Sequence, residues 1–327
     1  MGGPTKWRFL VFNVEHDLGG WRTKEWEQFH EWVRKLNLVA FLRQEMTHSA
    51  TDGRRGFHAA RQALGMCGFM AAKTNPESPN PPAVFLRENA LFIAADYPQI
   101  EGWWLPAAQG RIQHLGREGG PELALASIHL DPNSPTQRLI EAERAVKWGA
   151  TKQIVGTDGE LYQVVQPCIL GGDLNSYSSS PDELIPPPDF STVLDKQHVV
   201  NRTLRDRATP DTGPWDTFTT AGFADLAHHA YAHLRQKKAL IGTTHYRTDQ
   251  GARTSERHPR IDFLFGNGCI PQALEKVEIV ESPVKSRIDH YGILATFDPG
   301  DLWDAVEETA RPRLIEEVEE TATRTTA

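Results

Sequence analysis

Carboxylate, amide and imidazole side chains stand beside short apolar runs of the sequence, at the points where those runs begin or end. Such side chains are the usual general acids, general bases and metal ligands of enzymes. Strand ends that meet at one edge of a sheet bring together residues that are far apart in the chain, so we expect one shared site. These residues are Asn13, Glu45, His129, Asp173, Asn175, Asp262, Asp289 and His290.

Several common catalytic motifs are absent from the sequence. It contains no GxSxG nucleophile elbow, no GxxxxGK[ST] phosphate loop, no HExxH zinc motif and no GxGxxG dinucleotide motif. His229 and His233 have a spacing that can bind zinc, but no third ligand is evident, and a solvated helix face is favoured. The chemistry is therefore expected to rest on the residues at the ends of the apolar runs.

The apolar runs predict a mixture of strands and helices. They are short and rich in β-branched or aromatic residues, which is typical of strands. Trp26, Phe29 and Val33 recur at helical spacing, and Thr23 is a suitable N-cap for a helix there. We also expect helices over 136–154 and 225–240, and a long surface loop over 245–260. The expected strands are 8–12, 38–42, 69–72, 83–86, 90–94, 123–128, 168–170, 261–265 and 292–297.

The composition is that of a folded globular protein. The 327 residues are 39% hydrophobic and 24% charged, with a net charge of −8, which excludes a disordered chain and a collagen-like repeat. Cys67, Cys168 and Cys269 form no CxxC pair, so reduced thiols in a cytoplasmic protein are expected rather than a zinc ribbon or a disulfide scaffold. No signal peptide is evident, and no apolar run approaches the ~20 residues that span a bilayer.

Four pieces of the sequence occur in an order that a known family shows. They are Gln44-Glu45, Gly172-Asp173-Leu174-Asn175, Arg260-Ile261-Asp262 and Asp289-His290. On these pieces the chain resembles the endonuclease/exonuclease/phosphatase superfamily, with its deoxyribonuclease I-like fold, over residues 7–297. The family usually has a serine where Ile288 stands. The resemblance implies an α/β (α+β) four-layered sandwich, in which two mixed β-sheets pack face to face with helices outside. It also implies a metal-dependent phosphoric ester hydrolase.

The same resemblance implies a divalent cation, Mg²⁺ or Mn²⁺, held by Glu45, Asn13 and Asp289. Mg²⁺ prefers oxygen ligands and keeps several waters, so one or two carboxylates suffice. Such an ion would bridge to a phosphate oxygen and offset the charge that develops in the transition state.

The resemblance also implies roles in the reaction itself. Asp173 would be the general base that activates the attacking water, and Asn175 would donate its amide to a phosphate oxygen or to that water. His290 would contact the phosphate, and Asp262 would fix the tautomer of its imidazole. His129 matches a His-Leu pair of the sphingomyelinase, inositol-phosphatase and deadenylase branches, where it contacts phosphate.

The substrate stays open between two classes. A nuclease is the first expectation, because the family is heavily nucleolytic and basic loops flank the expected site. A small-molecule or lipid-headgroup phosphodiesterase or phosphatase is the alternative, and a non-catalytic binding module on the same fold is a third. The substrate-binding candidates are Arg54, Arg55, Arg111, Arg260 and Tyr291, although the arginines would equally serve to keep loops soluble. Cleavage position, preferred metal and oligomeric state stay open.

Most of the acidity lies at the C-terminus. Residues 298–327 carry a net charge of −6, which leaves −2 for residues 1–297. We expect 1–297 to form the catalytic domain and 298–327 to form an acidic, partly helical tail that docks on the body or on a partner. Because the expected domain is nearly neutral, the acidic balance of the chain does not exclude a nucleic-acid partner.

Overall fold

Two six-stranded mixed sheets form the centre of the molecule. A computed structural model describes residues 5–47, 49–72, 75, 77–96, 102–117, 119–247 and 253–315. The strand order of the first sheet is β15 (Leu274–Val280), β16 (Gly292–Phe297), β1 (Trp7–Asn13), β2 (Ala40–Gln44), β4 (Ala83–Leu86), β3 (Cys67–Met70). The order of the second is β11 (Phe223–Asp225), β14 (Asp262–Asn267), β10 (Cys168–Asp173), β7 (Leu123–His129), β6 (Ala108–His114), β5 (Leu91–Asp96).

Strand β1 shows why the central strands read as continuous apolar runs. Alternate side chains of a strand point to opposite faces of the sheet. Phe9 and Val11 belong to the apolar cluster between the sheets, whereas Leu10 and Phe12 belong to the cluster under the outer helices. Both faces are covered, so neither face needs polar residues.

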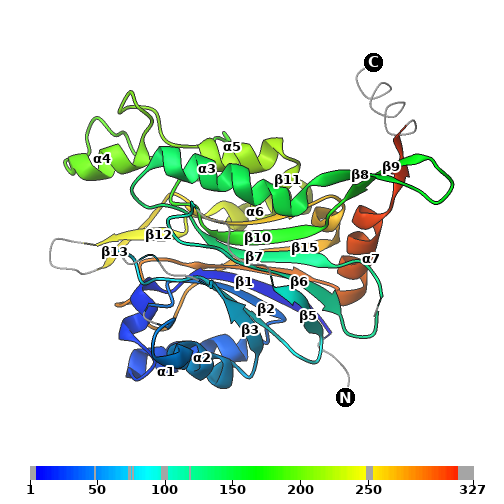
Figure 1. The fold of residues 1–327 in the computed structure, drawn as a ribbon. Coiled ribbons are helices and arrows are strands. Elements are labelled where there is room, and N and C mark those ends of the chain that lie inside the picture. The colour runs from blue at the N-terminus through cyan, green and yellow to red at the C-terminus, as the bar shows by residue number, and fades with distance from the viewer. Residues whose placement is uncertain are drawn as a thin grey trace.

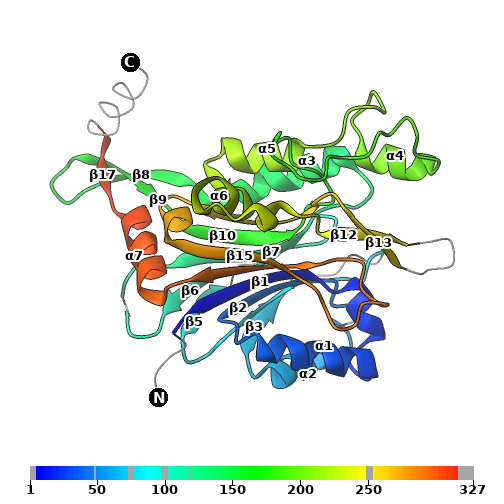
Figure 2. The same cartoon turned by 180° about the vertical axis from the view of Figure 1, so that it is seen from behind.

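Helices cover the outer face of each sheet, which completes four layers (Figures 1 and 2). Helices α1 (Lys24–Lys35) and α2 (Arg55–Leu64) pack on the first sheet, and α3 (Pro135–Ala145) and α5 (Gly213–Thr220) pack on the second. The Thr23 hydroxyl caps α1 by accepting a hydrogen bond from the Trp26 amide, as the sequence predicts. The four-layered sandwich is therefore confirmed.

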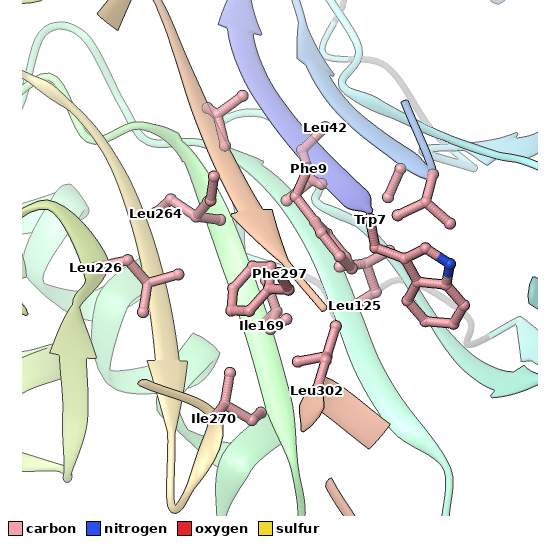
Figure 3. Close-up of a cluster of buried hydrophobic side chains, with 14 of the residues drawn as sticks. Trp7, Phe9, Leu42, Leu125, Ile169, Leu226, Leu264, Ile270, Phe297 and Leu302 are labelled. Atoms are coloured by element: carbon pink, nitrogen blue, oxygen red, sulfur yellow. The ribbon is translucent and has the colours of Figure 1, made fainter. Parts of the chain in front are cut away.

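The layer between the sheets is the main core (Figure 3). Phe9 and Leu42 of the first sheet meet Leu125, Ile169 and Leu264 of the second, and all five are at most 1% exposed. Helix α6 (Leu226–Leu234) closes one side of this layer, where it contacts β14 and β15. Burial of apolar area on this scale holds the two sheets together.

Helix α7 (Pro299–Ala310) closes the end of the sandwich where β1 begins. Its Leu302, Trp303 and Val306 are fully buried in the core layer, and the Trp303 ring lies 6.2 Å from that of Trp7. Beyond it, β17 (Arg313–Leu314) adds to a small sheet with β9 (Leu161–Val165) and β8 (Thr151–Val155). The described part of the acidic segment thus docks on the body.

The prediction of a helix over 136–154 is wrong after residue 145. Helix α3 ends at Ala145, and Thr151–Val155 forms strand β8 instead. Gly149 lies against Phe223 and Asn267, and the chain that follows is rich in β-branched residues and pairs with β9. The helix expected over 225–240 ends at Leu234, because Arg235 takes a left-handed conformation with φ of 57°.

Several strands have no clear signal in the sequence. Strands β6, β11 and β15 lie toward the outside of their sheets and mix polar with apolar residues. The expected surface loop at 245–260 is partly a hairpin, of β12 (Thr244–Arg247) and β13 (Arg253–His258). Helix α4 (Lys196–Arg202) lies in the polar insertion that precedes α5. Among the described residues, no helix combines the length and apolar character needed to cross a membrane.

Candidate active site

The strand ends that carry the predicted site residues meet at one end of the sandwich. Asn13 is paired with Gln44 in the parallel β1–β2 ladder. Asp173 is paired with both His129 and Asp262 in the second sheet. Because β16 runs antiparallel to β1, Asp289 and His290 come just before β16 at the same end. In Figure 1 the β12–β13 hairpin marks this end, and α7 closes the other.

Two glycines before Asp173 allow the sheets to approach each other closely here. A Cβ on Gly171 would lie 2.6 Å from the Val11 side chain of the first sheet. A Cβ on Gly172 would overlap the Ile128 carbonyl oxygen and lie 3.1 Å from the Gln44 side chain. The Gly-Gly pair is therefore required for close approach of backbones, and it brings Asp173 within reach of Asn13.

Asn13 connects residues from the two sheets. Its amide nitrogen lies 3.2 Å from Glu45 Oε1 and 3.1 Å from Asp173 Oδ2, so it donates to both carboxylates. The other oxygen of Glu45 accepts a hydrogen bond of 2.8 Å from the His16 amide. Glu45 itself has a φ of 59°, a left-handed conformation that non-glycine residues adopt mainly where the surrounding structure imposes it.

A buried ion pair supports this half of the site. Asp17 pairs with the fully buried Arg43, which stands two residues before Glu45 in the chain. Arg43 also bonds to the ring of His30 at 2.8 Å. Burial and the neighbouring Arg43 lower the pKa of His30 well below its usual value, so its ring is neutral and accepts this bond. The pair fixes the strand end from which Glu45 projects.

Asp173 is 2% exposed and faces two imidazoles. Its Oδ2 lies 3.7 Å from His129 Nε2 and 3.8 Å from His290 Nε2, and its Oδ1 accepts from the backbone N–H of Asn175 at 2.7 Å. Burial alone would raise the pKa of Asp173, but the positive charges of His290, His129 and Arg202 outweigh it. The pKa of Asp173 therefore lies below its usual value, and the carboxylate is ionised at neutral pH.

His290 and Asp262 form a hydrogen-bonded pair beside Asp173. His290 Nδ1 lies 2.8 Å from Asp262 Oδ2, and its Nε2 lies 3.7 Å from Asp289 Oδ1. Burial lowers the pKa of His290, but Asp262, Asp289 and Asp173 outweigh it and raise the pKa well above its usual value. Burial raises the pKa of Asp262 to about 6. At neutral pH the pair therefore consists of a carboxylate and an imidazolium.

Asn175 is held by the protein on both atoms of its amide group. Its Nδ2 donates to the Leu130 carbonyl at 3.0 Å, and its Oδ1 accepts from Arg202 at 2.6 Å. These bonds brace the turn after Asp173, and the expected contact of Asn175 with a phosphate stays a prediction. Asn175 has a φ of 52°, so the turn depends on these bonds.

The predicted substrate-binding residues do not gather in one place. Arg54 and Arg55 are exposed, in the segment that leads into α2. Tyr291 follows His290 and packs under the Arg257 guanidinium at 3.6 Å. Arg260 is buried and pairs with Asp225, and Arg111 is paired with Ala124 near the start of β7, away from His129. Arg111 thus lies away from the site, and the Arg260 guanidinium is held by Asp225.

Two groups of side chains have the donor atoms that a cation needs. In the first group, Asn13 Oδ1 is buried without a hydrogen-bond partner among the described residues, and the Asn13 amide nitrogen bonds to Glu45. Asp289 Oδ1 is also buried without a hydrogen-bond partner there, and it lies 3.7 Å from His290 Nε2. These oxygen donors suit Mg²⁺ or Mn²⁺. Asp173, Asp262 and His290 are the second group, with ligand atoms all within 4.8 Å of one another. Because Asp262 and His290 already bond to each other, we interpret this second group as an acid–base network.

Sequence reasoning missed several supporting residues. Arg202 reaches Asn175 from α4, and the Thr243 hydroxyl accepts from the amide of Asp262 at 3.3 Å. Nothing in the local sequence marks either of them. Arg43 did carry a signal, since a charged residue inside a buried strand requires a partner.

Comparison with known proteins gives the fold of this chain. No protein-family model matches the sequence, and no curated protein is similar to it in sequence. An endonuclease/exonuclease/phosphatase from Bacteroides vulgatus is similar in structure, with a TM-score of 0.58, 16% identity and 90% of this chain and 98% of that chain covered.

Two further solved structures are similar over most of the chain. For an AP endonuclease from Archaeoglobus fulgidus, the TM-score is 0.55 with 14% identity, 89% of this chain and 98% of that one. For D. rerio TDP2 complexed with single strand DNA product, the TM-score is 0.52 with 12% identity, 90% of this chain and 99% of that one. At such identities the likeness establishes a shared fold.

Proposed function

We propose that this chain, which has the fold of the endonuclease/exonuclease/phosphatase proteins, is a divalent-metal-dependent phosphodiesterase whose substrate is a nucleic acid. The observation that carries the proposal is the position of Asn13, which bonds to Glu45 on one side and to Asp173 on the other. The carboxylate that we propose as a metal ligand and the carboxylate that we propose as the general base are thereby linked through one amide group. Hydrolysis of a phosphodiester requires both.

The proposed reaction uses Asp173 as the general base. As the water oxygen bonds to phosphorus, its proton passes to the ionised Asp173, the ester P–O bond breaks, and the leaving oxygen takes a proton from solvent. The imidazolium of His290 donates a hydrogen bond to a phosphate oxygen and offsets its growing charge. Asp262 holds that imidazole in place through Nδ1.

Glu45, Asn13 and Asp289 would hold Mg²⁺ or Mn²⁺ in this proposal. When bound, such an ion neutralises phosphate charge and stabilises the leaving oxygen. The Glu45 carboxylate is available for this role because it is 14% exposed, and its φ of 59° fixes its direction. Calorimetry with Mn²⁺ should show weaker binding by Glu45→Gln than by the unaltered protein, and equal binding would remove Glu45 from the metal site.

Three observations favour a nucleic acid as the substrate. Arg55 is exposed and lines a cavity together with His16, whose amide donates to Glu45. The net charge of −2 for residues 1–297 leaves little general repulsion of a polyanion. The TDP2 structure with the same fold holds single strand DNA product. A small phosphoester is the second candidate, since His129 lies 3.7 Å from Asp173 and adds a donor at the centre of the site.

Salt dependence distinguishes the two substrates. With Mn²⁺ present, we expect cleavage of a single-stranded oligonucleotide whose kcat/KM falls steeply with salt, by a log–log slope of about −0.7 for each phosphate contacted. Phospholipid headgroup esters and free nucleotides should be poorer substrates. Fast hydrolysis of a small ester with little salt dependence, and none of the oligonucleotide, would establish the second candidate.

A further inference from the structure

A cavity of about 670 Å³ opens beside Glu45, between the segment that follows β1 and the segment that follows β2. His16 and Thr47 are part of its lining, and the His16 amide donates to Glu45. Glu45 is not part of the lining, but the cavity adjoins it through His16. Its volume is within the range of small-molecule sites, ~300–1,000 Å³.

One wall of this cavity carries an exposed indole. Trp21 lines it, is 36% exposed and belongs to none of the buried apolar clusters. The guanidinium of Arg22 lies 4.6 Å from the centre of the Trp21 ring, which helps to hold the ring in the wall. An exposed indole with no role in the core is a stacking surface for a flat aromatic group such as a base.

Other residues of the lining are charged. Arg55, the first residue of α2, lines the cavity and is exposed, and it makes no hydrogen bond or ion pair within the described part of the chain. Arg22 adds a second guanidinium, whereas Asp52 contributes a carboxylate. The neighbouring Arg54 is not part of the lining. A guanidinium without a protein partner suits a phosphate group.

We propose that this cavity binds the nucleotide next to the scissile phosphodiester, with the base stacked on Trp21 and its backbone phosphate paired with Arg55. The proposal rests on the proposed function, because it takes the scissile phosphate to lie at Glu45. It assigns single-stranded nucleic acid as the substrate, since the base must leave its own stack to reach the indole. A free phosphate would use Arg55 and leave Trp21 without a role.

The test compares a substrate that reaches the cavity with one that does not. For Trp21→Ala, we expect kcat/KM for a single-stranded oligonucleotide to fall about 5- to 100-fold relative to that for bis-p-nitrophenyl phosphate. For Arg55→Gln, the log–log salt slope for the oligonucleotide should shrink by about 0.7. Arg34→Gln removes an equal charge at an exposed position of α1 and is the matched control.

A binding experiment separates this proposal from the proposed reaction. Fluorescence anisotropy with a labelled oligonucleotide, Mn²⁺ and the Asp173→Asn protein measures the affinity for the oligonucleotide without turnover. Weaker binding by Trp21→Ala and Arg55→Gln in that background supports the cavity even if the unaltered protein cleaves nothing. Equal binding in all variants, or equal losses for both substrates, overturns it.

Discussion

At the scale of single residues, the types and positions of the site side chains can be predicted, but their partners cannot. Asn13 and Glu45 follow neighbouring strands, so their closeness is readable from the sequence. The bond from Asn13 to Asp173 is not, because it depends on the distance between two sheets. Arg202 reaches Asn175 only because α4 folds back over the turn, and no local pattern encodes that contact.

Asp262 is expected to limit the activity at acid pH. Burial raises its pKa to about 6, so the carboxylate that holds the His290 imidazolium is lost as the pH falls through that value. We expect kcat/KM to level off near neutral pH, where His290 is still an imidazolium, and to fall as the pH drops through about 6. Asp262→Asn should lower kcat/KM about 10- to 100-fold at pH 8 and remove this acid limb.

The check is a pH–rate profile of both proteins at saturating Mn²⁺. A metal titration at each pH controls for weaker metal binding in acid. If Asp262→Asn keeps an acid limb near pH 6, another group is responsible for it, and the assigned role of the Asp262–His290 pair is wrong.

At the scale of elements, the buried central strands are predictable and the outer ones are not. Strand β4 was predicted with its observed bounds, and β1 and β7 to within a residue at each end, because both faces of these strands are buried. Strand β15 was missed, since only some of its residues are buried and its sequence mixes Glu and Lys with Val and Ile. Strand β8 was predicted as helix. Its pairing with β9, which the local pattern does not show, makes it a strand.

Gly172 is required for the close pairing of β10 with β7 beside the site. A Cβ there would overlap the Ile128 carbonyl oxygen, which belongs to backbone and cannot move away as a side chain would. We expect Gly172→Ala to lower the free energy of unfolding by about 3 kcal/mol or more. Urea denaturation checks this value.

Gly213→Ala is the control for this substitution. A Cβ on Gly213 would meet its nearest neighbour, Asp211 Oδ1, at 3.4 Å, so the expected change is within about 1 kcal/mol in either direction. Equal stability of Gly172→Ala and the unaltered protein would show that the two strands do not depend on the glycine.

At the scale of the whole molecule, composition and packing divide the chain differently. Charge alone separates 298–327 from the rest. The structure buries the apolar face of α7 in the same core layer that holds the two sheets together, at the end opposite the site. The exposed face of α7 carries several of the acidic residues that give this segment its charge. Its buried face consists of a few apolar residues, which a count of charges does not detect.

Trp303 tests whether α7 is part of the folding unit. It is fully buried and contacts the rings of Trp7 and His114. We expect Trp303→Ala to lower the free energy of unfolding by about 3–5 kcal/mol. Asp304→Ala on the same helix removes a 67%-exposed carboxylate that pairs with Arg117 and should cost no more than about 1 kcal/mol. Similar losses for both variants in urea denaturation would mean that α7 is an appendage.

The most direct test of the central claim is the rate of bis-p-nitrophenyl phosphate hydrolysis with Mn²⁺, measured for the unaltered protein and for Asp173→Asn. His233→Ala, at an exposed position of α6, serves as the control. If Asp173 is the base that activates water, Asp173→Asn should lower kcat about 10²- to 10⁴-fold in a protein that circular dichroism shows to be folded, with His233→Ala at the unaltered rate. An Asp173→Asn protein that is folded and hydrolyses the ester at the unaltered rate would contradict the account.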